Sequence, residues 1–304
     1  MTDLVAAIDC GTNSVRILIA RATPSGLEDV DRRLFITRLG QGVDATGQFA
    51  PEALERTFAA MDDFAAQLRA LGGARTRVVA TSAARDAANS AEFFDGVRTR
   101  LGVDAEIISG AEEATLSYAG AVGALPRLAR PALVMDIGGG STELALGDAS
   151  LRTAVSLDMG SVRLRERFFA SDPPTPAEIA AAEDFVAGLL DGSGVPFGDA
   201  ASWVGVGGTA TCLSAIALEL AEYDSTLVHG STLARTTLDA LTDRLLAMPV
   251  AEIAEIPTMV PGRADVICAG ALICRAVGRR VSGDLCVSEA DILDGIAAKL
   301  MATT

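Results

Sequence analysis

The sequence predicts an α/β protein built from two domains that flank a cleft. Two observations lead to this fold class. Residues 5–20 combine an apolar run, an Asp, a Gly and a polar turn with an alternating apolar stretch, and residues 133–146 repeat that plan. After each of these segments, strand-like runs alternate with amphipathic helical runs, a pattern typical of α/β domains. The repeat therefore indicates two domains of similar construction.

The first half begins with a predicted β-hairpin, because the chain alternates between apolar and other residues on both sides of the polar turn. Helices are expected where apolar residues recur on one face every three to four positions. The expected elements of the first half are strands near 4–9, 15–22 and 27–38, a helix at 51–71, a strand at 77–82, a helix at 90–101, a strand at 105–108 and a helix ending near 123.

The second half repeats this order after a proline-bounded connector at residues 125–131, which we take as the domain boundary and hinge. The predicted domains are therefore residues 1–125 and 126–304, and the final helix could pack back on the first domain. The expected elements are strands near 132–137, 143–147 and 151–158, helices at 161–169 and 176–191, a strand at 203–206, and helices at 211–221, 235–247, 263–277 and 289–301.

Composition argues against several classes of protein. A length of 304 residues suits two domains, and no apolar run reaches the roughly 18 residues that a membrane span needs. The net charge of −15, without a basic stripe, argues against nucleic acid as a partner. The single His229 argues against a site built on several histidines. Five cysteines without paired metal-ligand spacing predict free thiols, and with the N-terminal residues they indicate a cytoplasmic protein.

The two polar turns are the segments most typical of chemistry. Asp9 precedes Gly11 in the first and Asp136 precedes Gly138 in the second, and hydroxyl or amide side chains follow each. Glycine lets the backbone approach an anion closely, and successive amides in such a turn form an anion-binding nest. A carboxylate beside the nest would repel a bare phosphate, so we expect a metal ion between them. One such turn is an ordinary glycine turn, but two predict loops that clamp a polyphosphate group.

Three further segments place polar residues where predicted strands end. Arg85 lies at a strand-to-helix transition that favours anions, although a surface arginine on a capped helix is the alternative. Glu112 and Glu113 open a helix, where capping is the alternative to activation of water. Residues 205–211 form a glycine-rich turn of the phosphate-binding type, which alone is weak evidence. Arg263 either forms an ion pair with Asp265 at the start of a helix or contributes to binding of the polyphosphate group.

Together these segments resemble the exopolyphosphatase/guanosine-pentaphosphate phosphohydrolase (Ppx/GppA) family, within the actin, sugar-kinase and heat-shock ATPase superfamily. The resemblance rests on motifs at residues 9–14, 81–89, 109–114, 136–143, 205–211, 261–267 and 288–295. It covers nearly the whole chain and corresponds to the short form, without a C-terminal histidine/aspartate-rich domain. It implies two actin-like (ribonuclease H-like) domains and hydrolysis of the terminal phosphoanhydride of inorganic polyphosphate, releasing orthophosphate, with Mg²⁺ or Mn²⁺.

The resemblance also implies a role for each matching residue. The catalytic residues would be Glu113, as the base that activates water, with Asp136 and Glu143. The metal would be held by Asp9, Asp136 and Glu143. The phosphate-binding residues would be Thr12, Asn13, Ser14, Arg85, Gly138, Gly139, Ser141, Thr142 and Gly208.

Other functions share these motifs and stay open. Guanosine pentaphosphate presents the same terminal phosphoanhydride, so its 5′-phosphohydrolysis is the main alternative. A superfamily kinase that transfers phosphate from ATP has the same two-loop plan, and a catalytically weak polyphosphate-binding regulator is a third class. The Ser109–Glu113 segment favours water as the acceptor. We expect no membrane or nucleic-acid partner, and the resemblance suggests a homodimer.

Overall fold

The computed structural model describes residues 4–23 and 26–303. The three residues ahead of the first predicted strand lie outside the described residues. The chain divides into two compact units, with unit 1 formed by Met1–Gly120 and Ile292–Thr304 and unit 2 by Ala121–Asp291. This division falls after Gly120, within a helix, whereas the sequence places it at the connector 125–131. Among the described helices, none combines the length and the apolar character needed to cross a bilayer.

Unit 1 begins with three strands that are followed by helices and two further strands. Its elements are β1 (Leu4–Cys10), β2 (Ser14–Thr23), β3 (Gly26–Ile36), α1 (Val43–Thr46), α2 (Pro51–Ala70), β4 (Arg75–Ala80), α3 (Ser82–Asp86), α4 (Ser90–Leu101), β5 (Ala105–Ile107), the first part of α5 (Gly110–Ala124) and, from the C-terminus, α13 (Ile292–Ala302).

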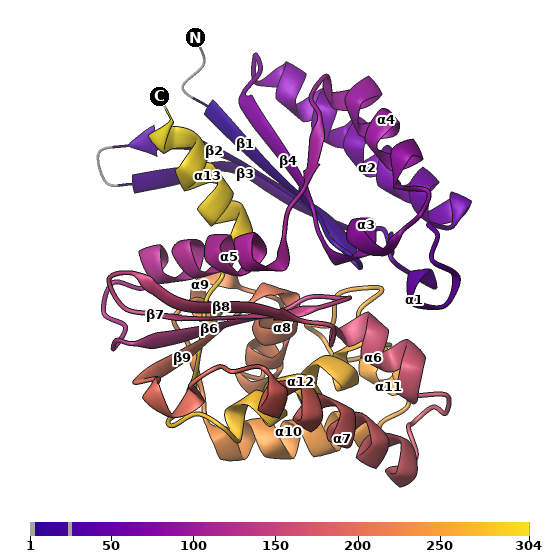
Figure 1. Cartoon of the computed structure of the whole chain (residues 1–304), viewed down its shortest axis with the longest axis vertical. Coiled ribbons are helices and arrows are strands. Elements are labelled where there is room, and N and C mark those ends of the chain that lie inside the picture. The colour runs from indigo at the N-terminus through magenta and orange to yellow at the C-terminus, as the bar shows by residue number, and fades with distance from the viewer. Residues whose placement is uncertain (1–3, 24–25, 304) are drawn as a thin grey trace. The chain divides into compact units, whose positions relative to one another are not determined.

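A five-stranded mixed sheet in the order β3-β2-β1-β4-β5 organises unit 1 (Figure 1). Strand β1 is antiparallel to β2 and parallel to β4, so it lies in the middle of the sheet. All seven residues of β1 are buried, because helices cover both faces. Leu4, Ala6 and Ile8 join the apolar cluster that includes α2 and α4, whereas Val5 and Ala7 pack with α5 and α13. This alternation places Asp9 on the α5 side.

Unit 2 contains the remaining elements. They are β6 (Ala132–Ile137), β7 (Thr142–Gly147), β8 (Leu151–Leu157), α6 (Ser161–Phe168), α7 (Pro176–Gly192), the 3₁₀ helix η1 (Phe197–Asp199), β9 (Ser202–Val206), α8 (Gly207–Ala217), α9 (Ser225–Val228), β10 (Thr232–Leu233), α10 (Arg235–Ala247), α11 (Val250–Ala254), α12 (Ile267–Gly278) and β11 (Leu285–Val287).

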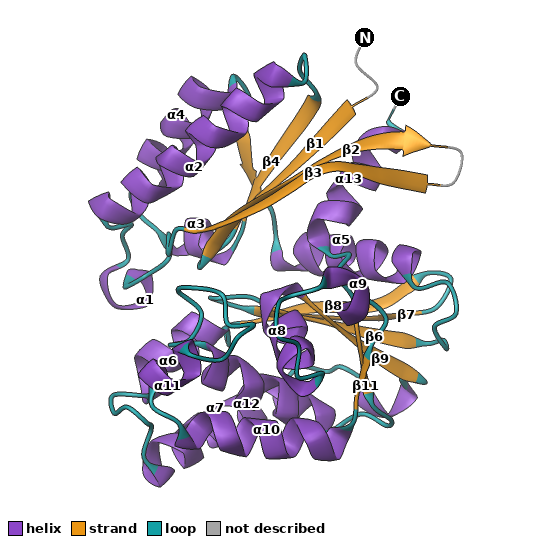
Figure 2. Ribbon diagram, turned by 180° about the vertical axis from the view of Figure 1, so that it is seen from behind, coloured by secondary structure: helices purple, strands orange, loops and turns teal. Residues whose placement is uncertain are grey.

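The sheet of unit 2 repeats the plan of unit 1 and has the strand order β10-β11-β9-β6-β7-β8. Strand β6 is antiparallel to β7 and parallel to β9, and β8 is antiparallel to β7. Leu133, Met135 and Ile137 of β6 enter one large core with residues of α7, α8, α10 and α12, and these helices lie together in Figure 2. Asp136, between two of these core residues, therefore faces the other side. The predicted α/β fold class with two hairpin-led halves is confirmed.

The structure differs from the sequence-based prediction mainly at helix starts and at very short elements. Helix α8 begins at Gly207, whereas the sequence places the glycine-rich segment before a helix at 211–221. Helix α12 begins at Ile267 and α13 at Ile292, a few residues later than predicted. The two-residue strand β10 and the three-residue strand β11 were not predicted, because so few residues show no periodicity.

Candidate active site

The two predicted phosphate loops have the same backbone geometry. In the first loop (residues 11–13), the Gly11 amide donates to the Ser14 carbonyl at 3.0 Å. In the second loop (residues 138–141), the Gly138 amide donates to the Ser141 carbonyl, also at 3.0 Å. Each bond closes the turn between two antiparallel strands. The sequence repeat is therefore a structural repeat, one copy in each unit.

The carbonyl oxygens of the first loop are bound by the chain segment that follows β3. The Gly40 amide donates to the Thr12 carbonyl at 2.8 Å, and the Thr37 and Arg38 amides donate to the Asn13 carbonyl at 3.1 and 2.9 Å. Within residues 4–23 and 26–303, the amides of Thr12 and Asn13 have no protein acceptor. A turn with its carbonyls occupied and its amides available is suited to an anion.

The second loop is held in the same way by the start of helix α6. The Ser161 amide donates to the Gly138 carbonyl at 2.9 Å, and the Arg163 amide donates to the Gly139 carbonyl at 3.0 Å. The Arg163 Nε atom donates to the Gly140 carbonyl at 2.8 Å. In the described part of the chain, the amides of Gly139 and Gly140 find no protein acceptor. The first amides of α6 are thus used to fix the loop, and the amide donors left for the predicted anion are those of the loop itself.

Close packing explains the glycine before α6 and the threonine after the loop. A Cβ on Gly160 would lie 2.2 Å from the Gly139 carbonyl oxygen, so only glycine allows the helix to approach the loop this closely. Thr142 is fully buried, and its hydroxyl donates to the Met159 carbonyl. The Thr142 hydroxyl therefore holds the loop in place. Ser141, which is 2% exposed, precedes it within the turn.

Two carboxylates in unit 2 face each other across the second hairpin. Asp136 on β6 and Glu143 on β7 are directly paired in the strand register, and both are buried. Ser156 on β8 is the next residue in the same row, and its hydroxyl donates to Glu143 Oε1 at 2.7 Å. Like charges at directly opposed positions repel each other, and a cation between them would relieve this repulsion.

This carboxylate pair fits a hard divalent cation. Among the described residues, no group of three or more His, Cys, Asp or Glu side chains could hold a metal ion. Mg²⁺ is commonly bound by one or two carboxylates and completes its coordination with water and substrate oxygens. Asp136 and Glu143 supply the type and number of ligands that such a site requires.

Asp9, the third predicted metal ligand, has a different neighbour. It is paired in the strand register with Arg16, whose Nη2 and Nε atoms lie 2.6 and 3.2 Å from Asp9 Oδ2. Both side chains are largely buried, with 7% of Asp9 and 16% of Arg16 exposed. The carboxylate at this position therefore carries an arginine as its counter-ion.

The structure separates Glu113 from the adjacent Glu112. Glu112 Oε1 binds Arg77 at 2.9 Å and Lys299 at 3.3 Å, and these contacts, led by Arg77, lower the pKa of Glu112 despite its partial burial. Glu113 is 8% exposed, and its Oε2 atom accepts from Arg85 Nη1 at 3.1 Å. Glu112 thus belongs to a surface ion-pair network, while Glu113 is the buried carboxylate next to a predicted phosphate-binding arginine.

The predicted residues of unit 1 gather at one edge of its sheet. Strands β1, β4 and β5 are parallel, so their carboxyl ends meet at this edge. The Thr81 amide donates to the Cys10 carbonyl at 3.3 Å, and the Ile108 amide donates to the Ala80 carbonyl at 3.2 Å. The residues brought to this edge are Asp9, Thr12, Asn13, Ser14, Arg85 and Glu113.

The predicted residues of unit 2 gather at the equivalent edge. Asp136 is paired with Val206, the last residue of the parallel strand β9, so the start of α8 lies beside it. A Cβ on Gly207 would lie 2.8 Å from Asp136 Oδ1, which confirms this proximity. The residues at this edge are Asp136, Gly138, Gly139, Ser141, Thr142, Glu143 and Gly208.

Arg263 covers the first turn of α8. A Cβ on Gly208 would lie 1.4 Å from Arg263 Nη1, so glycine provides the space in which this guanidinium sits. The sequence left the role of Arg263 open, because its contact with Gly208 joins two positions that are 55 residues apart in the chain. The structure adds it to the polar groups at the edge of the second sheet.

The comparisons with known proteins identify the family of this chain. The family model described as Ppx/GppA phosphatase family matches residues 18–292. This chain belongs to the Ppx/GppA phosphatase family. It is 46% identical to Exopolyphosphatase 2 of Mycobacterium tuberculosis, over 97% of this chain and 98% of that protein.

Several solved structures share the fold of this chain. A crystal structure of an exopolyphosphatase-like protein is 40% identical, with a TM-score of 0.95 and 99% coverage of both chains. The Aquifex aeolicus Ppx/GppA family member is 31% identical, with a TM-score of 0.84 and coverage of 99% of this chain and 98% of that one. An exopolyphosphatase from Cytophaga hutchinsonii, at 23% identity and a TM-score of 0.90, supports the fold alone.

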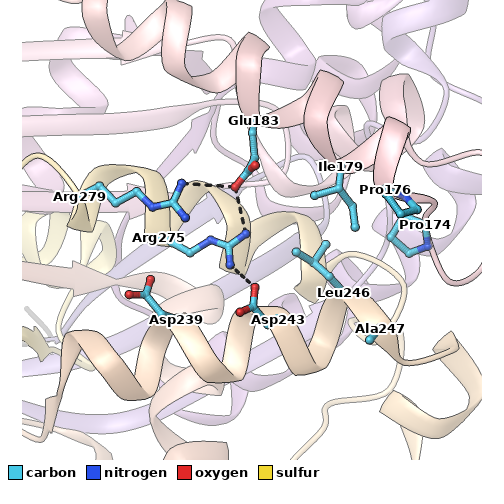
Figure 3. Close-up of a pocket in the computed structure, with 10 residues that line it drawn as sticks. All are labelled: Pro174, Pro176, Ile179, Glu183, Asp239, Asp243, Leu246, Ala247, Arg275 and Arg279. Carbon is cyan, nitrogen blue, oxygen red and sulfur yellow. Dashed lines mark hydrogen bonds and ion pairs between the residues drawn. The ribbon is translucent and has the colours of Figure 1, made fainter.

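A cavity of about 640 Å³ lies elsewhere in this Ppx/GppA protein, between α7, α10 and α12 of unit 2 (Figure 3). None of the predicted site residues lines it. Arg275, only 6% exposed, binds Glu183 at 3.0 Å and Asp243 at 2.5 Å, and Arg279 binds Glu183 at 3.4 Å. These ion pairs join three helices, so we interpret the charged lining of the cavity as structural.

Histidine and cysteine often serve in active sites, but in this Ppx/GppA chain both residue types have structural surroundings. His229 Nδ1 accepts a hydrogen bond from the Glu289 amide at 3.2 Å. All five cysteines are free. Burial, and then the charge of Asp9, raise the pKa of Cys10 well above its usual value, so its thiol stays protonated. Neither His229 nor Cys10 is a candidate nucleophile.

Proposed function

We propose that this chain is an exopolyphosphatase, which hydrolyses the terminal phosphoanhydride of inorganic polyphosphate and releases orthophosphate with Mg²⁺ or Mn²⁺. The observation that carries this choice is the 46% identity, along nearly the whole length of both chains, to a protein named exopolyphosphatase. Two anion-binding loops and a buried carboxylate that can serve as a base support the same chemistry.

The loops would bind phosphate oxygens through their backbone. Thr12 and Asn13 in the first loop, and Gly139 and Gly140 in the second, offer amide donors that the protein leaves unused in the described residues. Because neighbouring segments hold the loop carbonyls, these donors are oriented before an anion arrives. Donors fixed in advance stabilise the charge on phosphoryl oxygens without reorganisation.

Glu113 would act as the general base. Water attacks the terminal phosphorus as its proton passes to the Glu113 carboxylate, and the bond from that phosphorus to the bridging oxygen breaks. The shortened polyphosphate leaves with the bridging oxygen, and orthophosphate is formed. Glu113 then returns the proton to solvent. Arg85, which contacts the carboxylate at 3.1 Å, would keep it in position.

Asp136 and Glu143 would hold the divalent cation, whose charge would polarise the phosphoryl oxygens and offset the charge that develops on them. Ser156 would orient Glu143 through its hydrogen bond of 2.7 Å. Hydroxyl partners of this kind fix the geometry of a ligating carboxylate.

A substrate comparison tests the proposal. The purified chain is assayed with Mg²⁺ for phosphate release from long-chain polyphosphate, short-chain polyphosphate, guanosine pentaphosphate and ATP without an acceptor. We expect the highest kcat/KM on polyphosphate. A higher kcat/KM on guanosine pentaphosphate would instead assign the alternative phosphohydrolase activity. No release from any of them would favour a kinase or a polyphosphate-binding regulator.

A further inference from the structure

The two hairpins can be compared position by position. Asp9 and Asp136 each precede the first glycine of their loop by two residues, and each is paired with the residue seven positions later. That residue is Arg16 in the first hairpin and Glu143 in the second. Arg16 and Glu143 therefore occupy equivalent places, and they carry opposite charges.

The third strand extends this difference. Arg16 is paired with Leu34 on β3, whereas Glu143 is paired with Ser156 on β8. The row in the second hairpin is thus carboxylate, carboxylate and hydroxyl, all oxygen donors of the type that Mg²⁺ prefers. The row in the first hairpin is carboxylate, guanidinium and an aliphatic side chain.

The contact between Asp9 and Arg16 is close and sheltered. Two guanidinium nitrogens reach the same oxygen, Asp9 Oδ2, at 2.6 and 3.2 Å. Exposed fractions of 7% for Asp9 and 16% for Arg16 mean that water screens the pair only weakly. A divalent cation bound to Asp9 would have to share this carboxylate with the fixed positive charge of Arg16, which disfavours the cation.

We propose that Arg16 takes, in the first hairpin, the place that a divalent cation takes in the second, so that Asp9 is a salt-bridged positioning residue and not a metal ligand. The proposal rests on the proposed function only for the presence of that second cation. It reverses the metal-binding role that the sequence resemblance implies for Asp9.

Binding of Mn²⁺ to the full chain, measured without substrate by calorimetry or by the electron paramagnetic resonance signal of free Mn²⁺, tests the metal part. Asp9→Asn should bind Mn²⁺ within about threefold of the wild-type affinity, whereas Asp136→Asn should lose roughly 10-fold or more. An equal loss in both variants would overturn the proposal. So would a wild-type chain that binds no Mn²⁺.

A comparison of single and double variants at Asp9 and Arg16 tests whether the two side chains form a stabilising ion pair. Arg16→Ala leaves the Asp9 carboxylate buried without its guanidinium, so the melting temperature should fall. The double variant with Asp9→Asn removes both charges and should recover most of that loss, including recovery of folding if the single variant does not fold. A double variant no more stable than Arg16→Ala would contradict the proposal.

The results that would overturn this inference can be distinguished from those that would overturn the proposed function. A chain that binds Mn²⁺ through Asp136 but not Asp9, yet releases no phosphate, would support the inference about Arg16 and overturn the exopolyphosphatase activity. Phosphate release by the wild-type chain, with equal loss of Mn²⁺ binding in Asp9→Asn and Asp136→Asn, would support the exopolyphosphatase activity and overturn the inference about Arg16.

Discussion

Arg85 joins Glu113 to the end of a strand with a single atom. Its Nη1 lies 3.1 Å from Glu113 Oε2 and 2.9 Å from the carbonyl oxygen of Ile108, the residue after β5. The guanidinium therefore fixes a buried carboxylate against the backbone of the sheet edge. A general base needs such fixed placement, because its orientation toward the attacking water decides the rate.

Replacement of Arg85 should affect the rate more than the fold. In Arg85→Ala, Glu113 loses this contact, and we expect kcat for phosphate release to fall by about 10- to 100-fold, as for other misplaced catalytic groups. Steady-state kinetics on polyphosphate measure this loss. Arg77→Ala is the matched control, because Arg77 binds Glu106 and Glu112 at 2.9 Å and does not contact Glu113. An equal effect of both variants would contradict a positioning role specific to Arg85.

A methyl group at Gly208 should displace the Arg263 guanidinium. The contact of 1.4 Å that a Cβ would make is with the flexible end of the arginine, so the side chain can move and the melting temperature should change little. We expect Gly208→Ala to lower kcat/KM on polyphosphate by roughly 10-fold, as expected for loss of a charged phosphate contact. Arg263→Ala should show a similar loss, and adding Gly208→Ala to it should cost little more. Independent, additive losses would count against this link.

Removal of the Ser156 hydroxyl should weaken the response to Mg²⁺. Without the 2.7 Å bond to Glu143, the Mg²⁺ concentration for half-maximal phosphate release should rise roughly 10-fold, the lower end of the usual effect of an outer-shell partner. A Mg²⁺ titration of Ser156→Ala measures this shift. The exposed Ser150, just before β8, provides the control Ser150→Ala. An unchanged Mg²⁺ requirement in Ser156→Ala would contradict the role given to Glu143.

Glu178 should make unfolding of the chain pH-dependent in acid. Hydrogen bonds from the Thr175 amide, and then from the Thr175 hydroxyl and the Ser171 and Ala170 amides, lower the pKa of Glu178 to about 2. A carboxylate with a lowered folded-state pKa contributes stability that is complete above its ordinary pKa of 4.5 and is lost as the pH falls toward 2. Glu178→Gln should therefore lower the free energy of unfolding at pH 7 but not near pH 2. Urea unfolding across this range measures the difference, and a constant difference would contradict the prediction.

The hairpins and their loops could be predicted because local patterns specify them. Period-two alternation and a glycine turn define a hairpin within a dozen residues. The same local reasoning placed the start of α8 too late. Gly207 and Gly208 are typical of a loop between elements, yet in the structure they open the helix, and Gly207 has a φ of 72°. Two glycines are poor helix formers, so propensity alone delays the expected start.

Contacts between distant residues could not be predicted in the same way. Gly208 meets Arg263 because the start of α8 and the segment before α12 come together in the folded unit. Glu112 and Glu113 are neighbours in sequence, and only the positions of Arg77, Lys299 and Arg85 distinguish them. The contact of Asp9 with Arg16 was within reach, since a three-residue loop between paired strands sets their register. The roles of the site residues stay predictions.

Phosphate release by Glu113→Gln, with Glu112→Gln beside it, tests the central claim most directly. The two variants make the same chemical change at adjacent positions, one in the buried carboxylate and one in the surface ion-pair network. We predict that Glu113→Gln lowers kcat on polyphosphate by about 10²- to 10⁴-fold, the usual contribution of a general base, while Glu112→Gln stays within a few-fold of wild type. Similar activity in the two variants, or a larger loss in Glu112→Gln, would contradict the assignment of Glu113 as the base.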